Sequence, residues 1–277
     1  MSEGDDKLEM VRRDPDPRRQ GRRATELLVV YQQRSIELAR LRREAMRRLQ
    51  DEEGLSYAAV AAEFGLAKGR VGQITRSAPP AERGLFGVGP VTVAVPLRPG
   101  PDRSLPVIAS EDAIAYERLA TYLRDLLFPV EQQRIPLNGD WEPRGDVVAI
   151  CGPKSSPVSA AALAKDPMLD YHQGPDGRWE IADRRGGARY RSPLDDDPAS
   201  RRDIAYVGRL PVPGGSVLLI AGVHALGSAG AVDYLVGHAA EIYRAVGDAP
   251  FSMVTASRHD GEQVVESEVL WPPRRHG

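Results

Sequence analysis

Most side chains of the C-terminal half that could bind a ligand lie in two glycine-containing loops. The first reads CGPKSSP over residues 151–157 and the second reads AGVHALGSAG over residues 221–230, each after an apolar strand pattern. Because open α/β sheets bind ligands outside the carboxyl ends of their strands, we expect both loops to line one crevice. Backbone N–H groups at helix starts favour anions, so this crevice is predicted to bind a small phosphate-bearing or nucleotide-like molecule. The candidate ligand-binding residues are Gly152, Lys154, Ser155, Ser156, Gly222, His224, Gly227, Ser228 and Gly230.

The two loops also fit a structural role. Neither matches the Walker pattern GxxxxGK(S/T) or the dinucleotide pattern GxGxxG, so no nucleotide motif identifies them. Glycine and proline make tight turns, and Pro157 suits the first residue of a helix. A structural or oligomerising domain is therefore the alternative to a ligand sensor.

The same loops could also do covalent chemistry. Cys151 lies at a strand end beside a helix start, where its pKa would be lowered, and His224 would be its base. Asp183 or Asp203 would orient that histidine. This arrangement would make the chain a hydrolase or nucleosidase-type enzyme acting on a nucleotide-like substrate. A single cysteine in an apolar strand is usually a small buried hydrophobe, however, so we expect no enzyme activity.

Metal and cofactor sites are not expected. Five scattered histidines and one cysteine leave no zinc spacing, and a single cysteine cannot form an internal disulfide. The aspartates at 195–197 could bind a cation, but an exposed acidic loop explains them equally well. We therefore expect neither a metal nor a cofactor.

A second candidate site is the run LSYAAVAAEFGLAKGRVGQITRSA over residues 55–78. Val71 and Ile74 are three apart and are expected to face a small core, so the polar residues around them face outward. Arginine and glutamine match purine edges, while lysine and arginine reach phosphates. Interior glycines cost about 0.5–1 kcal/mol each relative to alanine, so Gly69 and Gly72 suggest close approach to DNA. The candidate DNA-binding residues are Ser56, Lys68, Gly69, Arg70, Gly72, Gln73 and Arg76.

This run resembles the helix-turn-helix of sigma-factor region four and related bacterial DNA-binding modules, over about residues 40–78. The residues in register are Ser56, Ala61, Gly65, Leu66, Arg70, Val71, Gln73 and Ile74. The resemblance implies binding of double-stranded DNA, a role in bacterial transcription regulation, and RNA polymerase as a candidate partner. Gly72 departs from the pattern, which usually has a charged or larger polar residue there. A helical hairpin within a protein-interaction module is the alternative.

The elements that would position the DNA-binding residues are three helices. Residues 1–22 are charged, contain two prolines and are expected to form a flexible arm. A domain over residues 23–78 would hold a long helix ended by Gly54, a short helix and a third helix from about 67 to 77. The long helix is expected to pack on the local core or to form a homodimer contact. Its apolar residues for either use are Leu27, Tyr31, Leu38, Leu41 and Ala45.

The ligand loops require a sheet. Residues 79–106 hold seven prolines and four glycines and are predicted to be a linker with an edge strand at 91–97. Beyond it, residues 107–277 alternate between strand and helix patterns, which predicts parallel strands with crossover helices. Residues 251–256 and 263–271 are expected to form a closing hairpin. The predicted class is α + α/β, an N-terminal three-helix helix-turn-helix domain followed by a Rossmann-like α/β domain.

Composition limits the class of protein. The chain has 277 residues, of which 42% are hydrophobic and 27% charged, without a long apolar run or a signal-peptide pattern, so a cytoplasmic location without membrane contact is expected. Residues 11–80 hold 15 Lys and Arg against 9 Asp and Glu, while residues 81–277 hold 21 against 26. A basic front segment favours a polyanionic partner. The sequence thus predicts a DNA-binding transcriptional regulator whose C-terminal domain senses a ligand or mediates oligomerisation.

Overall fold

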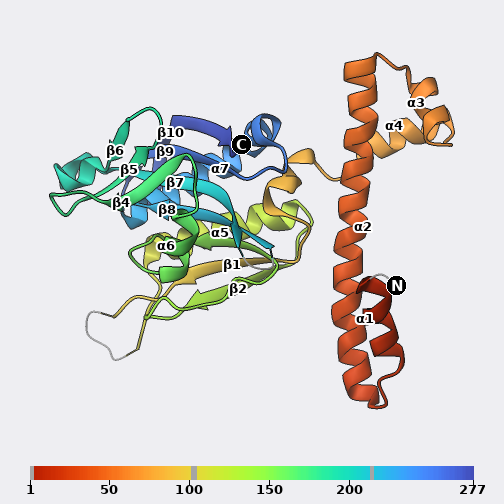
Figure 1. Cartoon of the computed structure of the whole chain (residues 1–277), viewed down its shortest axis with the longest axis horizontal. Helices are drawn as coiled ribbons and strands as arrows, with labels where there is room; N and C mark the ends of the chain where they lie inside the picture. The colour runs from red at the N-terminus through yellow and green to blue at the C-terminus, as the bar shows by residue number, and fades with distance from the viewer. Residues whose placement is uncertain (1–2, 101–104, 213–214) are drawn as a thin grey trace. The chain divides into compact units, whose positions relative to one another are not determined.

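The computed structural model describes residues 3–100, 105–212 and 215–277, and Figure 1 shows its elements. The chain divides into two compact units. The N-terminal unit runs to Ala81 and includes Val88–Pro90, and the C-terminal unit holds Glu82–Gly87 and the chain from Val91 onward. No helix within the described residues combines the length and the apolar character needed to cross a membrane.

The N-terminal unit is helical. It contains α1 (Glu3–Arg12), α2 (Pro17–Glu53), α3 (Tyr57–Glu63) and α4 (Lys68–Ser77). Gly54 ends α2 in the left-handed conformation at φ 66°, and the Ser56 hydroxyl accepts a hydrogen bond from the Ala59 N–H to begin α3. The core of this unit consists of Met46, Val60, Ala61, Val71 and Ile74, surrounded by Leu49, Leu55, Phe64 and Leu66.

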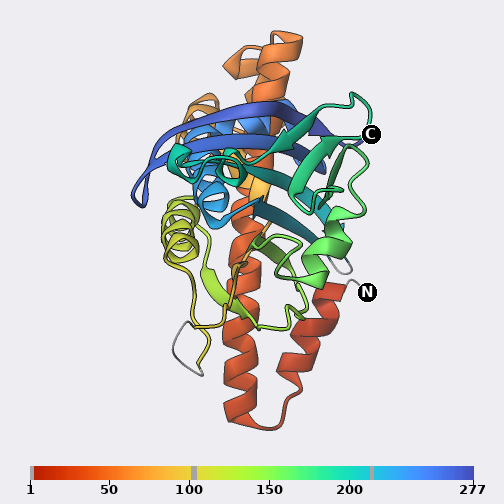
Figure 2. The same ribbon diagram turned by 90° about the vertical axis from the view of Figure 1, so that its left-hand side faces the viewer.

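Residues 3–22 differ from the flexible arm that the charge of residues 1–22 predicted, and residues 1 and 2 lie outside the described part of the chain. Residues 3–12 are helical, α2 already begins at Pro17, and Figure 2 shows α1 folded back along α2. At the corner, the buried carboxylate of Asp14 accepts hydrogen bonds from Arg19 and Arg23, each at 2.7 Å. The Arg19 hydrogen bond lowers the pKa of Asp14 to about 2. The prediction failed because these charges pair within the chain instead of remaining solvated.

The long helix also uses its apolar residues differently from the first expectation. Met46 and Leu49 supply its contribution to the local core. Tyr31, Leu38 and Leu41 are 38%, 66% and 42% exposed. These three residues therefore do not pack on the core of their own unit.

The C-terminal unit is built on a seven-stranded mixed sheet of order β10-β9-β7-β8-β3-β1-β2. Four neighbouring strands are parallel: β8 (Gly215–Gly222), β3 (Asp146–Ile150), β1 (Val91–Pro96) and β2 (Val130–Ile135). The other three are antiparallel to their neighbours: β7 (Arg202–Val212), β9 (Phe251–Asp260) and β10 (Gln263–Arg275). The class with helices and a mixed sheet agrees with α + α/β, and the predicted closing hairpin is present as β9 and β10.

Two expectations about this sheet were wrong. The strand predicted at the edge is β1, which pairs with both β2 and β3 because its apolar residues are buried on both faces. The region expected to be a linker therefore supplies an internal strand. The sheet is also only partly parallel, since β7 pairs directly with β8 in an antiparallel hairpin.

Helices and a smaller sheet cover the two faces. α5 (Ser110–Asp125) and α7 (Ala225–Val246) contact each other and pack on the large sheet. α6 (Pro157–Leu163) shares a core with alternate residues of the central strands, such as Val147 and Leu219. The smaller sheet has the order β4-β5-β6, and its strands are Leu169–Gln173, Trp179–Asp183 and Arg189–Arg191. The short 3-10 helices are η1 (Ala81–Phe86), η2 (Pro193–Asp195) and η3 (Pro198–Ser200).

Candidate functional site

A cavity of about 150 Å³ lies outside the carboxyl ends of β1, β3 and β8. The strand order reverses at this point of the sheet. From β1 the chain continues to β2 on one side, and from β3 it continues toward β8 on the other side. Both predicted loops contribute to its wall. The lining residues are Arg98, Asp112, Ile150, Cys151, Gly152, Lys154, Ser155, Gly222, Val223, His224, Ala225 and Ser228.

Six of the nine predicted ligand residues line this cavity, and Ser156, Gly227 and Gly230 do not. Ser156 is buried and begins α6. Its hydroxyl donates a hydrogen bond to the Gly139 carbonyl at 2.8 Å and accepts one from Trp141 Nε1 at 3.1 Å. The predicted ligand contact of Ser156 is therefore replaced by a structural one.

Gly227 and Gly230, which do not line the cavity, allow α7 to pack closely on the sheet. A Cβ atom at Gly227 would collide with the Ile204 carbonyl, and one at Gly230 would collide with the Ser257 side chain. Both positions thus need glycine for helix-to-sheet packing. The ligand prediction for these two glycines was wrong because glycine in such a loop can serve either ligand binding or close helix packing.

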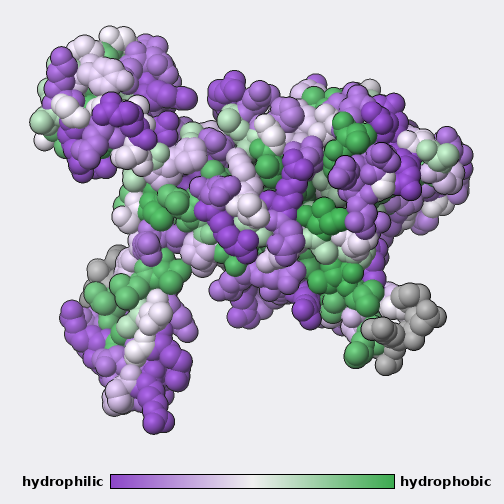
Figure 3. Space-filling model, turned by 180° about the vertical axis from the view of Figure 1, so that it is seen from behind, coloured by the Kyte–Doolittle hydropathy of each residue, from purple (hydrophilic) through white to green (hydrophobic). Residues whose placement is uncertain are grey.

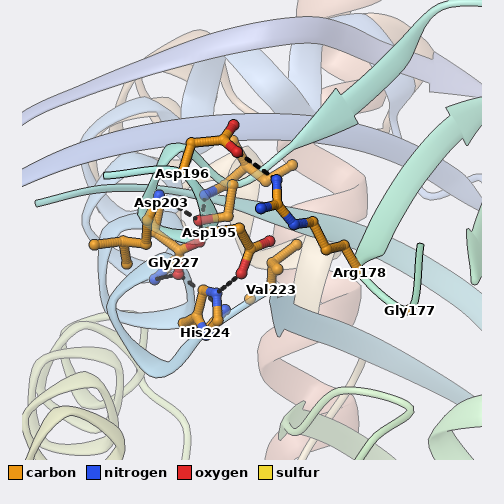
Figure 4. Close-up of polar contacts among 12 residues, drawn as sticks. Gly177, Arg178, Asp195, Asp196, Asp203, Val223, His224 and Gly227 are labelled. Atoms are coloured by element: carbon orange, nitrogen blue, oxygen red, sulfur yellow. Dashed lines mark hydrogen bonds and ion pairs between the residues drawn. The ribbon is translucent and has the colours of Figure 1, made fainter. Parts of the chain in front are cut away.

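The start of α7 is already occupied by a carboxylate of the protein. Asp203, which is fully buried, accepts hydrogen bonds through Oδ2 from the His224 N–H at 3.0 Å and the Gly227 N–H at 2.6 Å (Figure 4). The Ser228 hydroxyl accepts from the Gly222 N–H at 3.0 Å. The anion cradle expected at this helix start is therefore filled from within the chain.

A different aspartate orients His224. The Nε2 atom of His224 lies 2.9 Å from Oδ1 of Asp195. Figure 4 draws this contact as a dashed line. Asp203 contacts the backbone of His224 instead of its ring, and Asp183 accepts from the Trp271 indole and nearby backbone N–H groups. Both aspartates proposed from the sequence for this task are thus engaged elsewhere.

The acidic run at 195–197 is explained by these local contacts. Asp196 pairs with Arg178, and Asp197 accepts from the Ala199 N–H at the start of η3. Over the part of the chain that the structure describes, no three His, Cys, Asp or Glu side chains gather as a metal site.

Side chains from distant elements fix the second loop. Lys154 Nζ donates to the Val223 carbonyl at 2.6 Å, and the Tyr171 hydroxyl donates to the Gly222 carbonyl at 2.8 Å. Burial lowers the pKa of Lys154. The hydrogen bond to Val223 therefore holds the Lys154 ammonium group at the cavity wall. Because burial disfavours the charged form of this lysine, an anion bound in the cavity would stabilise it.

Sequence reasoning missed the third wall of the cavity. Arg98 follows β1 and Asp112 lies in the first turn of α5, with Arg98 Nη2 2.9 Å from Asp112 Oδ2. Asp112 is 1% exposed, and burial raises its pKa. Arg98 was missed because residues 79–106 were assigned to a linker, and Asp112 was missed with it because its role depends on Arg98. Identifying VTVAVP as an internal strand would have placed Arg98 at a strand end.

Cys151 lines the cavity but is a poor nucleophile. It is 1% exposed, and burial raises the pKa of its thiol to about 12. The sequence predicted the opposite shift, from a helix start beside the thiol. Burial dominates here, and the Ser156 hydroxyl already caps that helix.

The second candidate surface is α4. Val71 and Ile74 are buried, whereas Lys68, Gly69, Arg70, Gln73 and Arg76 are exposed. Arg70 Nη1 donates a hydrogen bond to Gln73 Oε1 at 2.6 Å.

Neither glycine of α4 is required by packing. A Cβ at Gly69 would meet nothing within 4 Å, and one at Gly72 would lie 3.6 Å from the Arg76 guanidinium. Ser56, also predicted to contact DNA, is exposed while its hydroxyl caps α3. The outward surface of α4 is thus polar, and no side chain projects from it at the two glycines.

Comparison with family models, with curated proteins and with solved structures found no match for this chain. Its function is therefore inferred from the two surfaces described above.

Proposed function

We propose that this chain is a cytoplasmic, DNA-binding transcriptional regulator in which α3 and α4 form a helix-turn-helix. The observation that carries the proposal is the outward face of α4, which is polar and contains two glycines without a packing role. Gly65, in the left-handed conformation at φ 62°, makes the turn between the helices. Arg70 and Gln73 are the proposed base-reading side chains, with Lys68 and Arg76 on phosphates.

The direct test uses the full chain and duplexes selected from a random pool. Arg70→Ala and Gln73→Ala should each weaken binding to the selected site by about 1–3 kcal/mol, measured by fluorescence anisotropy. Arg144→Ala, an exposed arginine of the C-terminal unit, is the control and should bind normally. Failure to select any sequence, or equal affinity of all variants, would remove the reason to regard α4 as a recognition helix.

The C-terminal unit is proposed to sense a small anion-bearing ligand in the cavity. Arg98, Lys154 and Ser155 supply cationic and hydroxyl groups on two walls, and Lys154 also holds the loop between β8 and α7 through the Val223 carbonyl. A cavity of about 150 Å³ is small beside the roughly 300–1,000 Å³ of drug-sized sites, which favours one phosphoryl or carboxylate group over a dinucleotide. Binding would shift the population of DNA-binding conformations.

Thermal-shift titration with inorganic phosphate, ribose 5-phosphate and unphosphorylated ribose tests this ligand class. Phosphate-bearing probes should raise the Tm of the full chain, and ribose should not. Arg98→Ala and Lys154→Ala should remove the shift, while Lys165→Ala, a lysine outside the cavity, should keep it. An unchanged Tm with every probe would contradict anion sensing but leave DNA binding untouched.

One observation favours an enzyme as the second candidate function. His224 lines the cavity with its ring oriented by Asp195, an arrangement that suits a general base. Such a hydrolase or nucleosidase-type activity would act on a nucleotide-like substrate. His224→Gln should abolish turnover in an enzyme, whereas a sensor would show no turnover in either form and would keep its DNA affinity.

A further inference from the structure

The α1–α2 hairpin carries an apolar stripe that its own unit covers only in part. On α2 the stripe consists of Leu27, Val30, Tyr31, Leu38 and Leu41, which fall within about 100° of one another around the helix. Met10 and Val11 of α1 continue it across a cavity of about 210 Å³ between the two helices. We call these seven residues the hairpin face. In Figure 3, hydrophobic surface is visible over the helical hairpin at the lower left.

We infer that the hairpin face binds the same face of a second copy of this chain, which makes the protein a homodimer. Two helices form a single layer, and a stable arrangement needs a second layer to bury its apolar side. A two-fold contact supplies that layer with an identical hairpin. The rim of the cavity holds Lys7 and Glu26, so it carries both charge signs.

The size of the face fits a weak but specific dimer. From Pro17 to Leu41, α2 is about 37 Å long, and α1 doubles the width along its own length of about 15 Å. With about 10 Å of width per helix, the face covers about 500 Å² per copy. Specific interfaces bury about 600–1,000 Å² per partner, so the hairpin face lies just below this range and a weak dimer, with a dissociation constant in the micromolar range, is expected. Arg34 lies within the stripe, and its apolar stem can pack while its guanidinium reaches the edge.

The connection to α4 favours a copy of the chain over an unrelated partner. α2 runs without interruption from the hairpin to the core that holds α4. Joining two hairpins would therefore place two α4 helices in a fixed relation. Dimeric DNA-binding proteins need such a relation to read half-sites about 34 Å apart.

Sedimentation velocity of the full chain without DNA, at about 1–100 µM, tests the inference. The wild-type chain should pass from monomer to dimer across this range. Leu38→Glu should raise the dissociation constant at least about tenfold, because each copy would bring a charge into the apolar contact. Circular dichroism should show unchanged helix content, since Leu38 is 66% exposed.

Leu28→Glu is the matched control. Leu28 lies on the same helix and is 68% exposed, but it projects about 100° away from Leu27, outside the stripe. It should dimerise like the wild type. A wild-type chain that stays monomeric throughout, or equal weakening by both substitutions, would overturn the inference. Because DNA is absent, either result is independent of whether α4 reads bases.

Discussion

The backbone N–H of Gly227 donates a hydrogen bond to Oδ2 of Asp203 at 2.6 Å, across 24 residues of sequence. The same oxygen accepts from the His224 N–H, so one buried carboxylate satisfies the start of the longest helix of the C-terminal unit. An external anion would compete with this carboxylate at the helix start. Anion binding in the cavity must therefore depend on Arg98 and Lys154.

The Asp203→Asn substitution should destabilise the chain and strengthen the binding of anions in the cavity. Loss of the charge weakens two hydrogen bonds at the helix start, with an expected cost of about 1–3 kcal/mol in the free energy of unfolding, read from urea denaturation. The remaining positive end of α7 should increase the thermal shift produced by phosphate. Asp197→Asn, at the exposed start of η3, should change neither quantity. Unaltered stability of the Asp203 variant would show that its hydrogen bonds contribute little.

The Gly69→Ala substitution should change the stability of the chain and its DNA affinity in opposite directions. Alanine should raise the free energy of unfolding by about 0.5–1 kcal/mol, because nothing lies within 4 Å of the added methyl group. The same methyl group should weaken DNA binding if α4 approaches the groove at this point. Gly21→Ala is the matched control, another glycine within a helix and without neighbours, and should give the stability gain with unchanged DNA affinity. Similar DNA affinity for the two variants would argue against close approach at Gly69.

Cys151 should resist alkylation in the folded chain. Burial raises the pKa of its thiol to about 12, so iodoacetamide at about pH 8 should label it only after unfolding in guanidinium. Mass spectrometry gives an unambiguous answer, since this is the single cysteine of the chain. Rapid labelling of folded protein would restore Cys151 as a candidate nucleophile.

The α1–α2 corner should be stable at neutral pH and should lose stability in acid. The pKa of Asp14 falls from 3.8 to about 2, so the corner gains stability above 3.8 and loses it as the pH falls through about 2. Hydrogen exchange of α1 should therefore accelerate over that acidic range. Asp14→Asn should show the loose corner already at neutral pH, whereas Asp51→Asn, in an exposed i,i+4 pair, should not. Slow exchange of α1 in the Asp14 variant would mean that packing alone holds the hairpin.

Local patterns in the sequence were sufficient for much of the N-terminal unit. Gly54 and Ser56 mark helix ends through backbone conformation and capping, which involve residues only a few positions apart. The spacing of Val71 and Ile74 identified the buried side of α4. Charge was a poorer guide, since Asp14 and its arginines form a helical corner where a flexible arm was expected.

The sequence by itself determined which loops follow buried strands, and therefore that residues 151–157 and 221–230 meet at one cavity. Only the tertiary structure decided which side chains complete it. Asp195 lies 29 residues from His224, and Lys154 lies 69 residues from the carbonyl of Val223 that it binds. Periodicity records which side of an element is buried, but strand order decides which distant polar groups become neighbours. For that reason Arg98 and Asp112 became visible only once β1 was placed inside the sheet.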